Sequence, residues 1–509
     1  MTDACGTTSL WMEHAMPSFA PLAQNARCDV CVVGAGIAGM TTAYMLAKSG
    51  VSVIVVDRVG VGGGQTSRTT AHLSFALDDR YSELERVHGK RGARLAADSH
   101  RAAVDMIESI VAEQGIACEL ERLDGYLILA PGASVDLLEA ELEAARDAGV
   151  DDVTLVPRAP LPRGDSGPCL RFGAQGQFHP TKFLSALARE IERSSGRIYT
   201  ETHVAEVQGG TPCRVQTRSG AEITCDAVVV ATNTPFNDRV TMHTKQAAYR
   251  TYAIALNMPE RSVERALFWD TADPYHYVRC ASFGDGREVL IVGGEDHKTG
   301  QADDTDARFE RLEQWTRQLF PAVQDVVHRW SGQVLEPVDG LAFIGRNPHD
   351  SSNVYIATGD SGHGMTHGVI AGRLISDLIQ GRPNPWAELY DPSRTSLKSV
   401  GELAHENLNV ARQYGDWLRG SDVESIERIA PGTGAVIRDG VHKLAIYRDD
   451  AGATHACSAV CPHLGCVVHW NGTERSWDCP CHGSRFDAYG ELLEGPANRG
   501  LTPHAPDSR

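Results

Sequence analysis

The sequence predicts an α/β protein in which a doubly wound domain carries an α+β lobe and is followed by a small all-β domain. Three observations predict this fold class. An apolar strand at 28–33 enters a glycine-rich turn and then a helix, and the same order of strand, glycine turn and helix returns between 340 and 380. Residues 421–509 combine short strands and turns with a cluster of cysteines between Cys457 and Cys481.

Length and composition are typical of a multidomain globular protein. A chain of 509 residues is too long for one hydrophobic core and suggests roughly two to four domains. The net charge of −18 argues against nucleic acid and anionic membrane surfaces as partners. No run approaches the ~18 apolar residues of a membrane span, and no secretory signal is visible. We therefore expect a cytoplasmic protein with no membrane span.

Periodicity divides the chain into segments. Apolar residues at helical spacing predict helices over 79–115, 133–148, 180–193 and 303–319. The predicted domains are an N-terminal arm at 1–26, the doubly wound domain in three pieces at 27–78, 150–240 and 336–385, the inserted lobe at 79–149 and 241–335, a linker helix at 386–420, and the β domain at 421–509.

The first glycine turn has the spacing of a dinucleotide site. Gly34-x-Gly36-x-x-Gly39 follows a strand and opens a helix. The first glycine permits the tight turn, the second lets the backbone approach a pyrophosphate, and the third lets the helix pack on the strand. Asp57 ends the next strand, where its carboxylate is expected to accept hydrogen bonds from the adenosine ribose.

Later segments favour FAD over NAD. Thr232 follows a strand, at a place where flavoproteins often return to the nucleotide. The run Gly359–Thr366 precedes the last helix of the domain, and its backbone N–H groups are suited to stabilise negative charge on a reduced flavin. The predicted flavin-binding residues in this run are Gly359, Gly362, Gly364, Met365 and Thr366.

With these motifs in place, residues 28–380 resemble the D-amino-acid-oxidase-like family of FAD-dependent amine oxidoreductases. Gly345-Arg346 also matches the family's motif at the flavin end of the cofactor site. Tyr275-His276-Tyr277 resembles the corresponding segment of members that are fused to a Rieske domain. The resemblance implies an FAD-binding domain, a substrate-binding lobe, and oxidation of a C–N bond by hydride transfer to flavin. Some members of the family attach FAD covalently to a histidine just after the second strand. Arg68 occupies the matching position in this sequence, so we expect FAD to be bound non-covalently.

The cysteine cluster offers metal ligands. Cys461-x-His463 and Cys479-x-x-His482 place one cysteine and one histidine on each of two loops. A Rieske [2Fe-2S] cluster needs two thiolates on one iron and two imidazoles on the other. The alternative is a zinc site with two cysteines and two histidines.

Further residues resemble respiratory Rieske proteins. In that family, cysteines at the positions of Cys466 and Cys481 form a disulfide between the two loops, and a segment such as Gly495-Pro496-Ala497 covers the cluster. A tyrosine that hydrogen-bonds a ligand sulfur is replaced here by Phe486. The resemblance implies a small all-β Rieske domain over 421–509.

The substrate residues are less defined by the sequence. Trp269, Tyr275 and Tyr277 either surround a cationic amine through cation–π contacts or simply pack as alternating strand residues. Arg279 lies on the same strand face as the tyrosines, where it is a candidate to pair with a substrate carboxylate. We name Tyr275, Arg279 and His363 as candidate catalytic residues. The isolated His243 is interpreted as a surface or core residue.

A flavin takes up two electrons at once and a Rieske cluster passes one, so a chain that joins them suggests a path for electrons from a substrate to an acceptor. We expect electrons to pass from an amine or N-substituted amino acid to FAD, to the cluster, and then to a one-electron acceptor protein or quinone. One alternative is an electron-delivery component for a partner oxygenase, and another is a redox sensor. Because the two cofactor sites occupy separate sequence blocks, we expect a chain ending at Gly420 to keep FAD.

Overall fold

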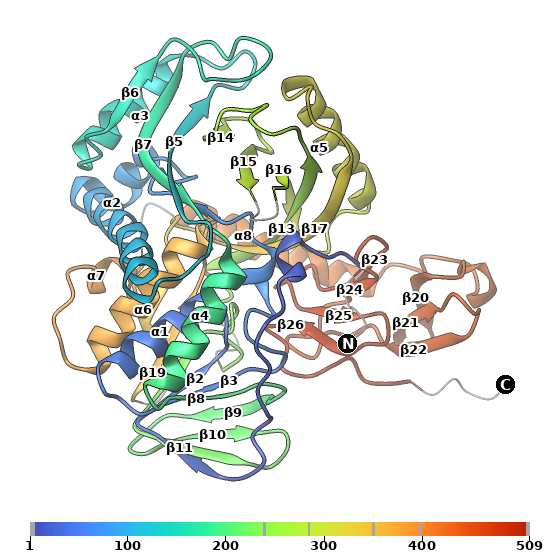
Figure 1. Ribbon diagram of the computed structural model, residues 1–509. Helices are drawn as coiled ribbons and strands as arrows, with labels where there is room; N and C mark the ends of the chain where they lie inside the picture. The colour runs from blue at the N-terminus through green and yellow to red at the C-terminus, as the bar shows by residue number, and fades with distance from the viewer. Residues whose placement is uncertain (1–5, 238–240, 283–285, 349–351, 396–399, 505–509) are drawn as a thin grey trace.

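A six-stranded sheet forms the centre of the molecule in the computed structural model, which describes residues 6–237, 241–282, 286–348, 352–395 and 400–504 (Figure 1). The strands follow the order β18-β19-β12-β2-β3-β8, and all pairs are parallel except β18 with β19. Valine-rich strands buried on both faces are typical of such sheets. The strands are β2 (Val30–Val33), β3 (Val53–Val56), β8 (Arg197–Tyr199), β12 (Ala227–Val230), β18 (Phe343–Arg346) and β19 (Val354–Thr358).

Helices pack beside this sheet and against one another. Helix α1 (Ile37–Lys48) contacts both α4 (Pro180–Arg193) and α6 (Gly364–Ile379), and α2 (Tyr81–Gln114) packs on α6. The other side is covered by a small sheet of β1 (Ala26–Arg27), β11 (Glu222–Cys225), β10 (Cys213–Thr217) and β9 (Val204–Gln208). The predicted helix at 180–193 matches α4.

The lobe is built on a large sheet with the order β17-β13-β16-β15-β14-β5-β7-β4, and β6 pairs with β7. Its strands are β4 (His72–Leu73), β5 (Glu121–Ile128), β6 (Val153–Val156), β7 (Cys169–Gln177), β13 (Gln246–Asn257), β14 (Leu267–Asp270), β15 (His276–Ser282), β16 (Glu288–Lys298) and β17 (Val326–Pro337). Helices α3 (Asp136–Asp147) and α5 (Thr305–Leu319) lie at its edges (Figure 1).

Two predicted domain boundaries differ from the structure. Strand β7 pairs with β4, β5 and β6, so β4, β6 and β7 belong to the lobe sheet, although the sequence assigned 27–78 and 150–240 to the FAD-binding domain. The reason is physical: alternating apolar residues predict a strand but do not say which strand it pairs with.

The C-terminal region forms two small antiparallel sheets. One contains β20 (Thr433–Asp439), β21 (His442–Arg448) and β22 (Thr454–Ser458), and the other β23 (His469–Asn471), β24 (Ser476–Asp478), β25 (Arg485–Asp487) and β26 (Leu492–Glu494). Helices α7 (Ala387–Tyr390) and α8 (Val400–Gln413), with the 3-10 turns η4 (Tyr414–Trp417) and η5 (Ile426–Arg428), lead into it. Sheet β23–β26 lies nearer the rest of the molecule than sheet β20–β22 (Figure 1).

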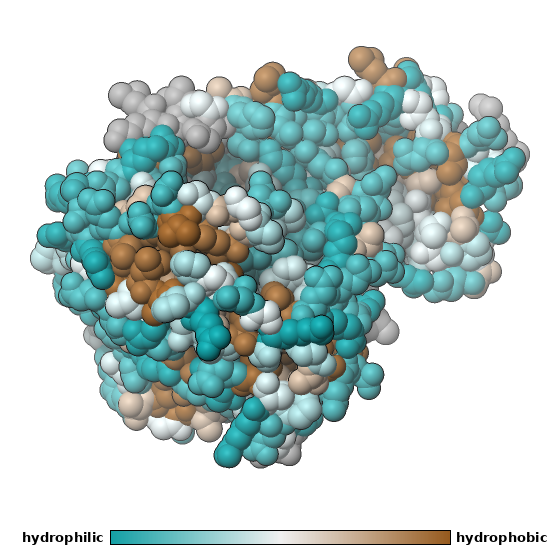
Figure 2. Space-filling model, turned by 90° about the horizontal axis from the view of Figure 1, so that it is seen from above, coloured by the Kyte–Doolittle hydropathy of each residue, from teal (hydrophilic) through white to brown (hydrophobic). Residues whose placement is uncertain are grey.

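The N-terminal arm is packed into the body from Gly6 onward. Its turn η1 (Leu10–Glu13) buries Trp11, whose indole N–H donates to the Thr69 carbonyl at 2.6 Å. Across the described residues, no helix is long and apolar enough to cross a membrane. The face shown in Figure 2 is mostly hydrophilic, with an apolar patch near one side.

Candidate functional site

A cavity of about 920 Å³ lies where the doubly wound domain, the lobe and the C-terminal domain meet. Its size is in the range of cofactor and ligand pockets. Most of the predicted cofactor and substrate residues line it: Gly34, Gly36, Asp57, Arg68, Thr232, Tyr275, Gly359, Gly362, His363, Gly364 and Met365. Gly39, Thr366 and Arg279 are not part of its lining.

The glycine turn has the geometry that a nucleotide cradle requires. Gly34 has φ +108°, and a Cβ there would collide with the Ala231 carbonyl oxygen. Gly39 packs against the Gly34 carbonyl, so a side chain at Gly39 would push α1 off the strand. The turn therefore brings bare backbone to the cavity at the start of α1, where unpaired N–H groups favour a phosphate. FAD fits this cradle.

Asp57 lies beside this turn at the end of β3. Its carboxylate accepts hydrogen bonds from the N–H groups of Ala35 (2.8 Å), Val59 (2.7 Å) and Gly60 (3.0 Å). Burial raises the pKa of Asp57, and these three bonds oppose the rise. The carboxylate is thus fixed in the cavity wall, in place for the predicted ribose contact.

Two candidate residues are directed away from the cavity. Arg279 is 2% exposed, and its guanidinium donates to the carbonyl oxygens of Ala71 (2.6 Å) and Phe178 (3.1 Å) and stacks over Trp11. The geometry does not bring it to a substrate carboxylate. The Thr366 hydroxyl lies 2.8 Å from His100 Nδ1, inside the packing of α2 and α6.

Arg68 borders the cavity but its head group points out of it. The guanidinium donates to the Ser331 carbonyl (3.0 Å) and to Thr7. It lies 4.0 Å from Glu474 of the C-terminal domain. The residue that replaces the covalent histidine of some relatives therefore also contacts the interface between domains.

The opposite end of the cavity holds a histidine and a carboxylate. His363 Nε2 lies 2.9 Å from the backbone N of Asp78 and 3.3 Å from Asp78 Oδ1. Tyr275 donates its hydroxyl to Asp78 Oδ2 at 3.1 Å. The Asp78 N–H can donate only to an unprotonated Nε2, whereas the carboxylate pairs with a protonated one. Both protonation states of His363 therefore have a partner.

The charges of His363 and Asp78 follow from the groups that surround them. Burial alone would lower the pKa of His363, but the carboxylates of Asp78, Asp79 and Asp360 hold it above its usual value. Burial would raise the pKa of Asp78, but His363 holds it below its usual value. Burial raises the pKa of both Asp79 and Asp360 to about 6. An anionic Asp78 thus faces the cavity beside an imidazole whose pKa is held above its usual value.

Aromatic rings form the wall above this pair. Trp269, Tyr275 and Tyr277 all line the cavity, and the two tyrosine rings lie 5.3 Å apart. Trp269 on β14 pairs in register with Tyr277 on β15, and Tyr277 OH lies 2.7 Å from Thr251 Oγ1. These rings therefore pack across neighbouring strands, as one of the two alternatives expects, and they also face the cavity.

The predicted iron–sulfur ligands come together on two adjacent loops. The hydrogen bond between the thiols of Cys461 and Cys479 raises the pKa of Cys479 well above its usual value and holds that of Cys461 below it. The rings of His463 and His482 lie 4.9 Å apart. Nδ1 of His482 is buried and has no hydrogen-bond partner among the described residues, as a metal-ligating nitrogen would be. The donor set fits a [2Fe-2S] cluster.

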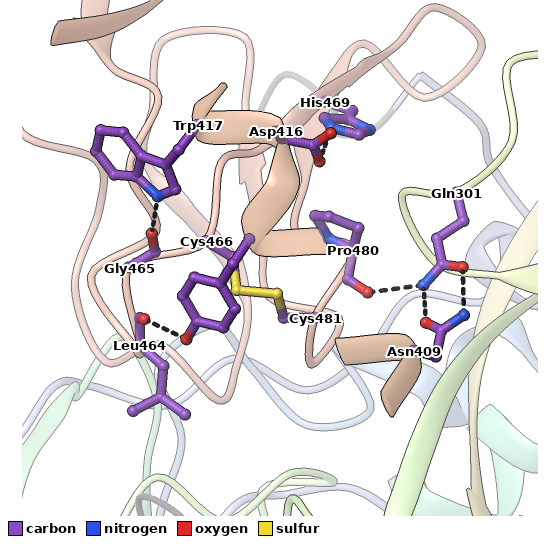
Figure 3. Close-up of a disulfide and its surroundings, with 11 residues drawn as sticks. Gln301, Asn409, Asp416, Trp417, Leu464, Gly465, Cys466, His469, Pro480 and Cys481 are labelled. Atoms are coloured by element: carbon purple, nitrogen blue, oxygen red, sulfur yellow. Dashed lines mark hydrogen bonds and ion pairs between the residues drawn. A yellow bond between two sulfur atoms is a disulfide. The ribbon is translucent and has the colours of Figure 1, made fainter. Parts of the chain in front are cut away.

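The two loops are joined by the predicted disulfide. Cys466 and Cys481 are bonded, with Cα atoms 6.4 Å apart (Figure 3). Their sulfurs lie close to that of Cys479, but bonded cysteines cannot ligate a metal. Cys479 therefore belongs with Cys461, as the spacing predicts.

The surroundings of the cluster loops match the expected pattern. Ser484 hydrogen-bonds the Cys461 sulfur and accepts the Ala497 N–H at 2.9 Å. The covering segment at 495–497 is thus tied to the ligand loop. Phe486, where respiratory proteins have tyrosine, is fully buried and offers no hydroxyl.

The structure adds functional residues that the sequence did not indicate. His243 is buried, as one of the two expectations for it has it, and its ring lies 4.8 Å from that of His463 and 5.9 Å from that of His482. Gln333 lines the cavity and also contacts the cluster loop. Residues 491–495, 497 and 498 of the C-terminal domain also line the cavity. Apart from Gly495 and Ala497, which belong to the covering segment expected from the sequence, no local motif marks these residues, because the contacts join segments far apart in the chain.

Comparison with known proteins defines the class. Residues 29–378 match the family described as FAD dependent oxidoreductase, and residues 421–505 match the Rieske [2Fe-2S] domain. The chain therefore belongs to the FAD-dependent oxidoreductase family and carries a C-terminal Rieske domain. It is an oxidoreductase whose cofactors are FAD and a [2Fe-2S] cluster, which confirms both predicted cofactors and excludes the zinc alternative.

Individual relatives share this architecture in whole or in part. The chain is 33% identical to the Rieske 2Fe-2S iron-sulfur protein YhfW of Bacillus subtilis (strain 168), over 96% of this chain and 95% of that protein. It is 25% identical to gamma-glutamylputrescine oxidoreductase of Escherichia coli (strain K12), over 74% and 89%. The structure of glycine oxidase from Geobacillus kaustophilus superposes with a TM-score of 0.62 at 18% identity, over 73% of this chain and all of that one.

Proposed function

We propose that this enzyme oxidises a C–N bond of an amine or N-substituted amino acid, and that the electrons leave singly through the Rieske cluster to an external one-electron acceptor. One observation carries the proposal. The aromatic wall of Trp269, Tyr275 and Tyr277 and the carboxylate of Asp78 line the same end of the cavity. Aromatic faces beside a carboxylate are suited to bind a cationic amine.

The charges of the cavity favour an amine over an amino acid carboxylate. Among the described lining residues, the arginines are Arg58, Arg68 and Arg218. Arg58 donates to the Leu492 carbonyl and Arg218 to the Asn498 carbonyl, both in the Rieske domain. Arg68 is directed to the domain interface, as described above. All three guanidinium groups therefore contact residues of the Rieske domain.

The protein's own groups have separate roles in the proposed reaction. When bound, FAD supplies the hydride acceptor. Asp78 and the rings bind and orient the ammonium form of the substrate. His363, through Nε2, takes the proton that the amine must lose before its C–H bond is broken. Tyr275 holds Asp78 in place through its hydroxyl.

The relatives support the substrate class. The Escherichia coli relative is named for oxidation of gamma-glutamylputrescine, and the Geobacillus neighbour for oxidation of glycine. Both names describe compounds that contain an amine. The acceptor is proposed to be a carrier protein or a quinone, since a Rieske centre passes one electron at a time.

An anaerobic substrate screen tests the proposal. The purified holoenzyme is mixed with monoamines, diamines and N-methyl amino acids, and flavin bleaching is followed. We expect a cationic amine to bleach the flavin, and Asp78→Asn to slow bleaching more than about tenfold, as loss of a charged contact of 1.5–3 kcal/mol implies. Asp226→Asn, an exposed carboxylate outside the cavity, is the matched control. Bleaching by NADH but by no amine would instead support electron delivery to an oxygenase.

A further inference from the structure

The cluster-binding loop of the Rieske domain rests directly on the wall of the flavin cavity. Gln333 in β17 is 2% exposed and lines the cavity. Its backbone N–H donates to Gln65 Oε1 at 2.7 Å, and its side-chain Nε2 donates to the Gly483 carbonyl at 2.7 Å. Gly483 directly follows the ligand His482. One side chain therefore connects the cavity wall with the loop that holds the cluster.

The fit at Gly483 is too close for any side chain. Gly483 has φ +77°, and a Cβ there would overlap the Ala248 Cβ and lie 2.6 Å from Gln333 Nε2. His243 contacts the rings of both predicted ligand histidines. His463 and His482, which are half-buried, thus lie against the flavin-binding body.

A buried charge network locks the domains together. Glu474 of the Rieske domain is 1% exposed and lies 3.6 Å from Arg485 of the same domain. It also lies 3.7 Å from Arg250 of the lobe and 4.0 Å from Arg68. Arg250 further pairs with Glu494 at 3.4 Å. Separating the domains would break all of these ion pairs together, so the network fixes the orientation of the Rieske domain on the lobe.

The loops that carry the predicted cluster ligands also make hydrogen bonds with the lobe and with the linker. Gln301 of the lobe donates to the Pro480 carbonyl at 3.0 Å, and His469 donates to the Gly300 carbonyl at 2.8 Å (Figure 3 shows the first of these). On the linker side, Trp417 donates to the Gly465 carbonyl at 3.1 Å (Figure 3). Relative domain motion is the default unless the interface is large and hydrophobic. In this protein, hydrogen bonds and buried ion pairs on several sides of the ligand loops provide the restraint instead.

We propose that the Rieske domain is permanently docked, and that electrons cross from the flavin cavity to the cluster at the Gln333–Gly483 contact without domain movement. This inference rests on the proposed function for the source of its electrons. Each substrate loses two electrons and two protons as its C–N bond becomes C=N. The electrons cross the contact one after the other, two molecules of a one-electron carrier protein take one each, and the protons pass to water.

An engineered disulfide tests permanent docking. The hydroxyl oxygens of Thr305 on α5 and Thr473 in the Rieske domain lie 2.6 Å apart, so cysteines at both positions can bond. The flavin of the T305C/T473C holoenzyme is photoreduced, which makes the result independent of any substrate and hence of the proposed function. Mass spectrometry confirms the bond. We expect the cluster to be reduced at a rate within about twofold of the T305C single variant. Loss of cluster reduction in the locked protein would overturn the proposal.

A second experiment tests the contact itself. In Gly483→Ala we expect transfer from flavin to cluster to slow at least about tenfold, since small misplacements have large rate effects, while the cluster keeps its EPR signal. Hydrogen exchange of segment 479–484 should rise. Ala248→Gly in the same chain removes the closest overlap and should restore both readouts in part, because the contact with Gln333 Nε2 and the positive φ remain. Gly440→Ala is the control, because Gly440 has φ +59° and no atom near its Cβ. Equal transfer rates in Gly483→Ala and Gly440→Ala would contradict the proposed route.

Discussion

The two cofactor sites of this enzyme are built in opposite ways. The predicted cluster ligands lie on two loops between Cys461 and His482, and their spacing alone is enough to predict them. The FAD cavity is lined by residues from Met12 to Asn498, contributed by three domains. A site made by nearby residues is visible in the sequence, whereas a cavity made by distant segments depends on how whole domains pack. Each prediction below tests whether the two sites are as separate as their sequences suggest.

The largest effect is expected from losing a cluster ligand. Cys461→Ser should abolish the [2Fe-2S] cluster and turnover with a one-electron dye, while substrate still bleaches the flavin, because the cluster acts after flavin reduction. EPR spectroscopy and single-turnover absorbance measure both. Cys457→Ser is the matched control, since Cys457 is buried in the same domain but is not a ligand. Unchanged dye turnover in Cys461→Ser would remove the cluster from the route.

Removing the Rieske domain should weaken FAD binding. The sequence suggested that a chain ending at Gly420 keeps FAD, but the structure shows the cavity lined by the Rieske residues Leu492, Leu493 and Asn498. We now expect this truncation to raise the FAD dissociation constant about tenfold or more, as loss of one or two hydrogen bonds and a cavity wall implies. Equilibrium dialysis measures it, with full-length Cys461→Ser as control. Equal affinities would restore the modular interpretation.

A smaller effect is expected from pH at the flavin end. Neighbouring carboxylates hold the pKa of His363 above 6.5, so its base form grows as pH rises. Below that pKa the rate of flavin reduction should rise about tenfold per pH unit and then level off. His363→Gln should lose this limb of the profile. A profile identical in wild type and variant would assign the proton transfer to another group.

The smallest effect is expected at Phe486. A tyrosine there should donate a hydrogen bond to a ligand sulfur, which favours the more negative reduced cluster and raises its potential. A bond of about 1 kcal/mol corresponds to roughly 40 mV for one electron. Voltammetry of the holoenzyme compares Phe486→Tyr with wild type. A lowered potential would show that the hydroxyl does not reach the sulfur.

Sequence patterns gave the elements but not all of their partners. Helix α4 and the strand, turn and helix around Gly34 lie where their periodicity and glycine spacing predict. Strands β6 and β7 were assigned to the wrong domain, because alternation does not encode pairing. Arg279 shares a strand with Tyr277, but its guanidinium is bound by the carbonyl oxygens of Ala71 and Phe178 and is not part of the cavity lining. Neither outcome follows from local propensity.

The contacts between the sites were not visible in the sequence. Gln333 is an ordinary polar residue in a strand, and His243 has no neighbouring ligand pattern. Both matter because the Rieske domain packs on the lobe, which brings Gly483 and His482 to them. Only tertiary structure reveals such residues, since their partners are more than a hundred positions away.

The most direct test of this account is an anaerobic rapid-mixing experiment on the intact holoenzyme with an amine that bleaches its flavin. Absorbance follows the flavin, and rapid-freeze EPR follows the cluster in the same time window. The account predicts that the flavin bleaches first and that the cluster is then reduced by one electron as flavin absorbance partly returns. A cluster that stays oxidised while the flavin remains fully bleached would contradict the route from substrate through FAD to the Rieske centre.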